Sequence, residues 1–112
     1  MSVPRVSVLL PTFNALATLP RAVASLRAQT FHDWELLVVD DGSTDGTADW
    51  LRTEATLEPR LKVISQPHAG IVPALNGGLA EARGEFVARM DADDESLPER
   101  LDRKSTRLNS SH

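Results

Sequence analysis

The sequence predicts an α/β domain with a mostly parallel sheet, and two observations support this fold class. Short apolar runs typical of strands alternate with segments whose apolar residues recur at helical spacing. The connections between them are short, which favours right-handed crossovers between parallel strands. The expected strands are residues 5–10, 35–39, 61–65 and 85–90, and the expected helices lie within residues 16–26, 47–57 and 70–83.

In the first half of the chain, apolar spacing and proline mark the elements. The run at 5–10 (RVSVLL) is strand-like and is expected to end at Pro11. Pro20 lies near the start of the next helix, where its missing N–H does little harm. Residues 35–39 (ELLVV) are almost continuously apolar, as in a strand buried on both faces. The first helix has its apolar residues at helical spacing, at Leu16, Leu19, Val23 and Leu26.

The second half repeats the alternation. Residues 61–65 (LKVIS) and 85–90 (EFVARM) are predicted strands, and Gly84 is expected to end the helix that precedes the last of them. The expected helix at 47–57 has an apolar stripe formed by Ala48, Leu51 and Ala55. The expected helix at 70–83 has one formed by Ile71, Leu75, Leu79 and Ala82.

Composition narrows the classes of function. The 112 residues contain no cysteine, which excludes disulfides, zinc-thiolate sites and a cysteine nucleophile. The net charge is −4, and the basic residues of the last ten positions leave the rest of the chain more acidic still. Nucleic acid is therefore not an expected partner, because phosphate binding needs clustered Lys and Arg. The first apolar run is too short for a signal or membrane segment, so we expect a cytoplasmic protein.

Polar loops follow three of the predicted strands, at residues 11–14, 40–46 and 91–94. In open α/β sheets, ligands bind beyond the carboxyl ends of the strands. These loops are therefore predicted to form one site. Trp34 and Trp50 are expected to pack in the interior, and His32 and His68 are interpreted as ordinary loop residues.

The Asp91-Ala92-Asp93 sequence is the sharpest feature of these loops. Two carboxylates around one small residue can converge on magnesium or manganese, which take carboxylates together with substrate phosphates. A solvated acidic surface is the alternative. A calcium EF-hand is disfavoured, because that pattern requires glycine where Ser96 lies and glutamate where Asp102 lies.

The adjacent pair Asp40 and Asp41, and the aromatic residue Phe13, each have both a structural and a functional interpretation. Asp40 and Asp41 could belong to a turn before a helix capped by Asp45 or Thr47, yet a carboxylate here could also accept a hydrogen bond from a uracil or similar base. Phe13 could stack on such a base or pack in the core at the sheet edge.

Four stretches, in this order and spacing, resemble the family 2 glycosyltransferases of the GT-A fold. They are VSVLLPTFNA, QTFHDWELLVVDDGSTDGT, GIVPALNGGLAEARGEFVARMDADD and LPERL, and together they span about residues 3–102. The resemblance implies a Rossmann-like nucleotide-diphospho-sugar-binding fold with helices on both faces of an incomplete sheet. On this basis residues 1–102 are the N-terminal portion of a GT-A domain, and residues 103–112 are a polar tail expected to be disordered or non-native.

The resemblance also implies a set of site residues. Pro11, Thr12 and Phe13 would line the base pocket, and Asp41 would bond the base. Asp91 would lie near the ribose and diphosphate, and Asp93, with Asp91, would bind manganese or magnesium. Arg83 is interpreted as structural. Asn76 lies where many relatives have an Arg-Asn pair, but Leu75 occupies the arginine position here.

The implied reaction is an inverting transfer of sugar, usually from a UDP-sugar, to a hydroxyl of an unidentified acceptor such as a saccharide or lipid-linked saccharide. The general base is expected in a later part of the family sequence, so no catalytic residue is assigned and the fragment is expected to be inactive alone. The full-length protein is expected in the cytoplasm, with the inner membrane face as one location. A nucleotidyltransferase and a non-catalytic truncated module are the alternatives.

Overall fold

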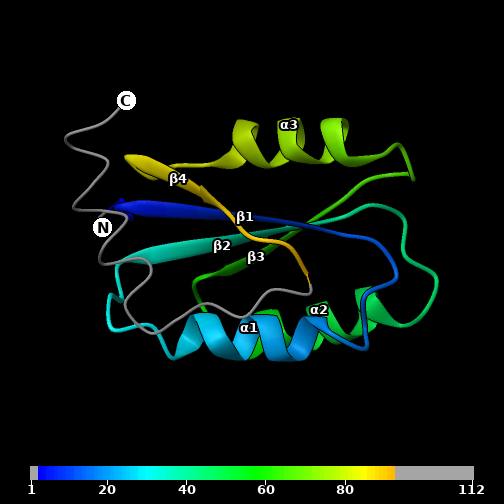
Figure 1. Ribbon diagram of the computed structural model, residues 1–112, viewed down its shortest axis with the longest axis horizontal. Coiled ribbons are helices and arrows are strands. Elements are labelled where there is room, and N and C mark those ends of the chain that lie inside the picture. The colour runs from blue at the N-terminus through cyan, green and yellow to red at the C-terminus, as the bar shows by residue number, and fades with distance from the viewer. Residues whose placement is uncertain (1–2, 93–112) are drawn as a thin grey trace.

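Four parallel strands form one sheet in the order β3-β2-β1-β4 (Figure 1). The computed structural model describes residues 3–92, so Asp93 and the tail at 103–112 lie outside the described residues. The predicted α/β class is confirmed. The elements are β1 (Val6–Thr12), α1 (Leu19–Arg27), β2 (Trp34–Asp40), α2 (Thr47–Leu57), β3 (Leu61–Ser65), α3 (Ile71–Glu81) and β4 (Phe86–Arg89).

The order of the strands creates a reversal between β1 and β4. From β1 the chain moves outward to β2 and β3 through α1 and α2, which cover one face of the sheet. It then crosses back through α3, on the opposite face, to place β4 on the other side of β1 (Figure 1). In open α/β sheets this reversal is where the connecting loops diverge and leave room for a ligand.

The core between the sheet and α1 and α2 is mostly aliphatic. Alternate residues of the strands point to this face, as the period of two requires, and pack against the apolar side of each helix. Trp34 is buried in this core and Trp50 packs against it, as expected. The fully buried members include Val6, Leu10, Leu19, Leu26, Leu36, Val38 and Leu51.

The face of α3 that packs on the sheet differs from the predicted stripe. Ala74 and Gly78 are its buried residues, whereas Ile71 and Leu79 are about half exposed. A Cβ on Gly78 would lie 3.1 Å from Leu9 Cδ2. Small residues therefore let the helix backbone lie close to the strands, and the larger apolar residues are turned outward.

Pro11 lies inside β1 and does not end it. Alternate residues of a parallel strand bond to opposite neighbours: Leu9 O accepts from Met90 N on the β4 side, and Thr12 O accepts from Asp41 N on the β2 side. Pro11 is on the same side as Leu9, beyond the last β1–β4 pair at Leu9 and Arg89. Its missing N–H therefore costs no ladder bond.

The turn into β4 is tied to the opposite, amino edge of the sheet. Arg83 donates from its backbone N to Glu35 Oε2 (2.8 Å) and from Nε to Oε1 (3.2 Å), which supports the structural interpretation of this residue. Burial alone would raise the pKa of Glu35, but the hydrogen bonds from Ser7 and Arg83 outweigh it and lower that pKa. Gly84 does not end α3, which stops at Glu81; a Cβ on it would lie 2.6 Å from Ser7 N.

Among residues 3–92, no helix is both long enough and apolar enough to cross a membrane.

Candidate functional site

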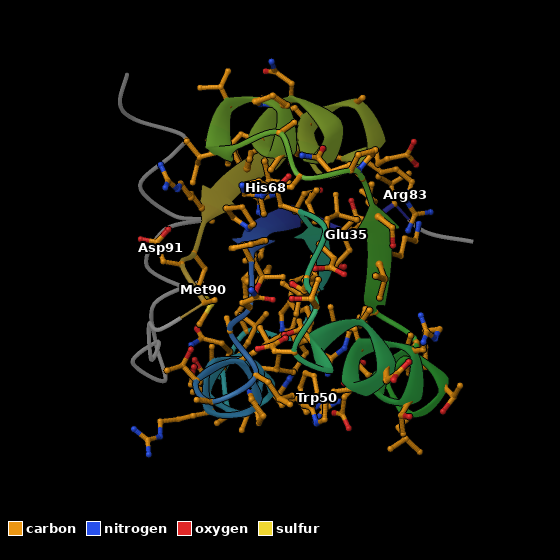
Figure 2. The ribbon with its side chains drawn as sticks, turned by 90° about the vertical axis from the view of Figure 1, so that its right-hand side faces the viewer. Glu35, Trp50, His68, Arg83, Met90 and Asp91 are labelled. Carbon is orange, nitrogen blue, oxygen red and sulfur yellow. The ribbon has the colours of Figure 1, made fainter. Side chains whose placement is uncertain are left out.

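The carboxyl edge of the sheet gathers the loops that the sequence singled out. Figure 2 faces this edge, with α3 above the sheet and α1 and α2 below it. The β1–α1 and β2–α2 loops leave adjacent strands here, and the β3–α3 loop folds back toward them. The loops after three of the four strands thus meet beside the reversal between β1 and β4.

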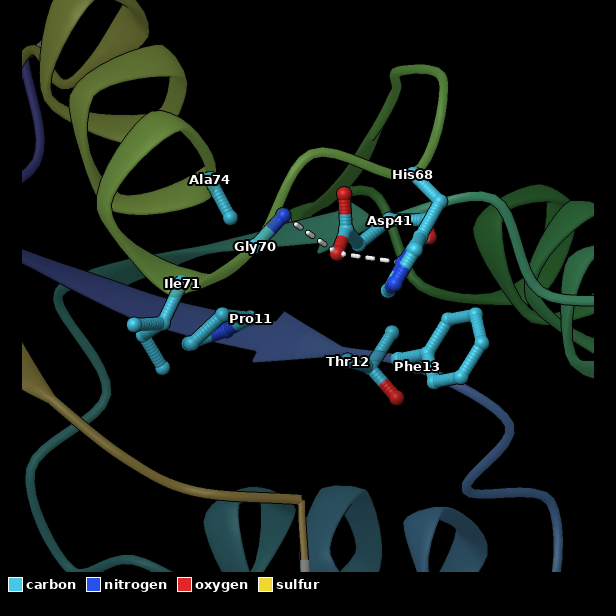
Figure 3. A pocket seen from close by; sticks show the side chains of 8 residues that line it. All are labelled: Pro11, Thr12, Phe13, Asp41, His68, Gly70, Ile71 and Ala74. Atoms are coloured by element: carbon cyan, nitrogen blue, oxygen red, sulfur yellow. Dashed lines mark hydrogen bonds and ion pairs between the residues drawn. The ribbon is translucent and has the colours of Figure 1, made fainter.

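A pocket of about 240 Å³ opens where these loops meet (Figure 3). Thr12 is buried in its wall, and its Oγ1 has no hydrogen-bond partner among the described residues. Figure 3 shows that this hydroxyl is directed away from Asp41, so Thr12 presents its methyl group. The lining residues are Pro11, Thr12, Phe13, Asp41, His68, Gly70, Ile71 and Ala74.

The carboxylate of Asp41 is the polar centre of the pocket. Its Oδ1 accepts from Gln66 Nε2 (2.7 Å) and Ala69 N (2.8 Å). Its Oδ2 accepts from Gly70 N (3.0 Å) and lies 3.0 Å from His68 Nδ1. The β3–α3 loop therefore wraps around a carboxylate that extends from the end of β2, and the two backbone donors lie directly before α3.

These donors keep the carboxylate ionised. The side-chain hydrogen bond from Gln66, followed by the backbone hydrogen bond from Ala69, lowers the pKa of Asp41 to about 2. Gly70 N and the charge of His68 act in the same direction. At neutral pH the pocket therefore contains a fixed negative charge that can accept a hydrogen bond from a ligand N–H.

Phe13 forms the exposed aromatic wall of the pocket. Its side chain is 46% exposed, so it is not a core residue. Its ring centroid lies 4.3 Å from that of His68, with the ring planes inclined by 33°. A flat apolar face at the mouth of the pocket, beside an anionic acceptor, is the arrangement that a planar heterocyclic base requires.

Asn14 fixes the loop that carries Phe13. Its φ of +48° is a left-handed conformation, which Asn tolerates better than most residues. Its Oδ1 accepts from Thr44 N (2.7 Å), while its own N donates to Ser43 Oγ (2.9 Å). This reciprocal pair joins the β1–α1 loop to the β2–α2 loop, so Phe13 and Asp41 are positioned by one connected unit.

The other aspartates of the β2–α2 loop accept hydrogen bonds from backbone amides within the loop. Asp40 Oδ1 accepts from Ser43 N (3.2 Å), and Asp45 Oδ1 accepts from Thr47 N (3.0 Å). Gly46 is the N-cap residue, with a φ of +96°, and Asp45 supplies the side-chain acceptor from one position earlier. The turn interpretation therefore fits Asp40 and Asp45, while Asp41 faces the pocket.

Asp91 follows β4 at the same edge. Its side chain is 53% exposed, and its Oδ1 accepts from Arg89 Nη2 (3.2 Å). Residues 3–92 contain no group of three or more His, Cys, Asp or Glu side chains placed to hold a metal ion. Asp93, the predicted metal ligand, lies outside the described residues, so the acidic pair stays a prediction. An exposed carboxylate at a strand end can serve as an oxygen ligand for magnesium or manganese.

Two side chains that contact Asp41 are not among the predicted site residues. Sequence position alone predicts His68 to be an ordinary loop residue, and Gln66 donates to Asp41 without lining the pocket. Both lie in the loop after β3, at the same edge as the polar loops that were recognised. This position at the carboxyl end of a strand is the signal that could have identified them.

Residues 7–105 match the model of the family described as glycosyl transferase family 2. A hyaluronan synthase of Pasteurella multocida is 33% identical over 100 residues, which are 89% of this chain and 10% of the synthase. An uncharacterized glycosyltransferase of Nostoc sp. is 41% identical over 100 residues, 88% of this chain and 31% of that protein. The family match at residues 7–105 spans the strands and loops that form the pocket.

Solved structures agree in fold. Residues 1–349 of Staphylococcus aureus TarS, in complex with UDP-GlcNAc, give a TM-score of 0.86 at 31% identity, covering 94% of this chain and 31% of that one. The mannosyltransferase PcManGT of Pyrobaculum calidifontis, in complex with GDP-Man and Mn²⁺, gives 0.75 at 34% identity, covering 83% and 28%. The fold is that of the GT-A glycosyltransferases, and the chain belongs to glycosyl transferase family 2.

The chain spans about a third of the length of three curated relatives that it matches, at 37%, 27% and 31%, and 10% of the hyaluronan synthase.

Proposed function

We propose that residues 1–102 are the donor-binding portion of a glycosyltransferase, and that the pocket at Asp41 holds the base of a nucleoside-diphospho-sugar. The observation that carries this proposal is a fixed carboxylate beside an exposed aromatic ring at the carboxyl edge of the sheet. Asp41 would accept the imino N–H of uracil or the corresponding N–H of guanine. Phe13 would stack on the base, with Pro11 and Thr12 beneath it.

The diphosphate is proposed to lie toward the end of β4. Met90 N donates to Leu9 O, so the chain leaves β4 beside the strand that leads to the pocket. From this position Asp91 would contact the ribose and diphosphate and, with Asp93, hold magnesium or manganese. The bound ion would supply positive charge to a diphosphate that an acidic chain would otherwise repel.

The proposed reaction of the whole protein is an inverting displacement. An acceptor hydroxyl attacks the anomeric carbon, the bond to the diphosphate breaks, and the proton passes to a general base. The acceptor proposed is a saccharide or lipid-linked saccharide. The mannosyltransferase complex contains GDP-Man and the TarS complex UDP-GlcNAc, so both base classes belong in the test.

Calorimetry with UDP and GDP, in manganese and in EDTA, tests the donor site. We expect one of the two nucleotides to bind in manganese and to bind much more weakly in EDTA, because Asp91 and Asp93 would hold an ion whose positive charge offsets the negative charge of the diphosphate. Asp41→Ala should lower the affinity for the nucleotide about 10-fold, because one charge-assisted hydrogen bond is lost. Its affinity for inorganic pyrophosphate should stay unchanged.

Asp49→Ala is the matched control, because Asp49 is an exposed aspartate on α2 away from the pocket. Thermal unfolding of both variants checks the fold, since Asp41 also accepts the backbone amides before α3. If the wild type and a folded Asp41→Ala variant bind the nucleotide equally well, Asp41 only holds the β3–α3 loop in place and does not bind the base. Absence of nucleotide binding by a folded wild type would favour a non-catalytic module.

A further inference from the structure

The imidazole of His68 already makes the two contacts that the proposed function assigns to a nucleobase. Its Nδ1 lies 3.0 Å from Asp41 Oδ2, and its ring lies 4.3 Å from the ring of Phe13, centroid to centroid. Figure 3 shows the imidazole between these two side chains at the mouth of the pocket. A base that entered the pocket would require the same acceptor and the same aromatic face.

His68 covers the part of the Asp41 carboxylate that its three hydrogen-bond donors leave open. A carboxylate offers about four lone-pair positions. Gln66 Nε2 and Ala69 N donate to Oδ1, and Gly70 N donates to Oδ2. His68 Nδ1 is hydrogen-bonded to the backbone O of Asp41 (3.2 Å) and lies 3.0 Å from Oδ2, so its ring covers the remaining lone pair. A base N–H can therefore reach Asp41 only when the His68 ring moves or one of the three donors leaves.

Among the four groups around the Asp41 carboxylate, His68 is the one that can move most easily. Ala69 and Gly70 donate from the backbone directly before α3, where movement would disturb the helix start. Gln66 is only partly exposed. The His68 side chain is 61% exposed, against 7% for Asp41, and rotation about its own bonds takes it into solvent.

The space between the rings excludes the alternative in which the base is sandwiched. A base stacked on both sides needs ring separations that sum to about 7 Å, since each carbon–carbon contact takes about 3.5 Å. The observed centroid separation of 4.3 Å corresponds to direct contact between Phe13 and His68. The base must therefore replace the imidazole against Phe13.

We propose that His68 occupies the nucleobase position in the ligand-free protein and must swing out when a nucleotide binds, so that it sets the affinity of the site for the base. This proposal rests on the proposed function of the pocket. It adds a residue that competes with the ligand and, by doing so, keeps the acceptor of Asp41 and the face of Phe13 covered until a base replaces it.

The test compares nucleotide binding by the wild type and His68→Ala, by calorimetry with UDP and GDP in manganese. Removal of the competing side chain should tighten binding of the preferred nucleotide about 10-fold, the value of one hydrogen bond to a charged group. Inorganic pyrophosphate, which has no base, should bind both proteins equally. His32→Ala is the matched control, because His32 is an exposed loop histidine that offers Arg60 only its backbone carbonyl (3.2 Å).

His68→Phe separates the two contacts. A phenyl ring can still lie against Phe13 but cannot donate to Asp41, so we expect a gain in affinity smaller than that of His68→Ala. The order of affinities expected for the nucleotide is therefore wild type, then His68→Phe, then His68→Ala as the tightest.

The outcomes distinguish this proposal from the function on which it rests. If the wild type binds a nucleotide and His68→Ala binds it equally or more weakly, the competition is refuted and the donor site stands. If neither protein binds a nucleotide while both are folded, the donor site itself is refuted, and the competition with it. A tightening that pyrophosphate shares would also overturn the proposal, because it would not involve the base.

Discussion

A carboxylate that accepts hydrogen bonds from two backbone amides, as Asp41 does from Ala69 and Gly70, has its direction fixed before a ligand arrives. Such preorganisation reduces the ordering that binding would otherwise require. Phe13 is held differently, by the reciprocal bonds of Asn14 to the neighbouring loop. Acceptor and aromatic face therefore keep a constant relation to each other.

Phe13→Ala tests the aromatic face. Base–aromatic stacking contributes about 1–3 kcal/mol, so nucleotide affinity should fall roughly 10-fold or more. Thermal stability should change little, because the ring is 46% exposed. Leu57→Ala, at an apolar residue that is 70% exposed, is the control for loss of a surface side chain. If calorimetry shows that Phe13→Ala binds the nucleotide as tightly as the wild type, Phe13 does not stack on the base.

The lowered pKa of Glu58 leads us to expect a pH dependence of the free energy of unfolding. Hydrogen bonds from the Arg60 side chain are the largest cause that lowers its pKa, from 4.5 to about 2, and Arg27 contributes as well. A carboxyl with a lowered folded-state pKa contributes stability above its unfolded value, and that contribution is lost as the pH falls through the folded value. The stabilising contribution of Glu58 should therefore disappear between about pH 4.5 and 2.

Urea unfolding of Glu58→Gln from pH 7 to pH 2 measures this. At pH 7 the variant should be less stable by about 2 kcal/mol, and the difference from the wild type should shrink toward zero at the acid end. Glu85→Gln, at an ion pair whose glutamate is 62% exposed, should show a small difference. A Glu58→Gln deficit that is constant with pH would contradict this account.

At the residue scale, the sequence pointed to those residues of the candidate site that stand out by type. Asp41 is the second of two adjacent aspartates at a strand end, and Phe13 follows Pro11-Thr12 in a polar loop. Polar residues at strand ends are visible without a structure. The contact of His68 with Asp41 was not predicted, because it depends on how the loop after β3 folds back to Asp41, which no local pattern encodes.

At the scale of elements, small residues determine how α3 meets the sheet. Ala74 and Gly78 form its buried side, and Gly78 allows the helix to approach Leu9 and Val39. Because the start of α3 carries the Gly70 amide that bonds Asp41, the depth at which the helix packs also positions one side of the pocket.

Gly77 and Gly78 offer a matched pair for testing this packing. A Cβ on Gly77 would meet Gln66 Oε1 at 3.7 Å, an ordinary contact, so Gly77→Ala should stabilise the protein by up to about 1 kcal/mol through helix propensity. Gly78→Val should destabilise it by about 1–3 kcal/mol, because its methyl groups would press on Leu9 and Val39. Thermal or urea unfolding gives both values, and similar effects at the two positions would contradict the packing described.

Helical spacing predicted where α3 lies but not which side faces inward. The stripe of Ile71, Leu75 and Leu79 is the more apolar side, and hydrophobicity alone would bury it. Close approach to the sheet favoured the side with Ala74 and Gly78 instead. The strands were easier to predict, because β2 is buried along its whole length and its sequence is correspondingly apolar.

At the scale of the molecule, the strand order explains why the site lies where it does. The chain reverses direction across the sheet between β1 and β4, with α1 and α2 on one face and α3 on the other (Figure 1). Alternation of strands and helices in the sequence predicted the parallel sheet, and the short connections predicted its crossovers. The edge on which a ligand is expected follows from the rule for open α/β sheets, while the closure of the pocket by the β3–α3 loop required the structure.

The most direct test of the account maps nucleotide contacts on the whole chain by NMR. The ¹⁵N-labelled protein would be titrated with UDP, and in parallel with GDP, in the presence of magnesium. We predict that amide signals of Phe13, Asp41, Ala69 and Gly70 shift with saturable concentration dependence, while those of Arg60 and Arg83 at the opposite edge of the sheet stay in place. Shifts confined to that opposite edge, or no shifts with either nucleotide, would contradict a donor site at the carboxyl ends of the strands.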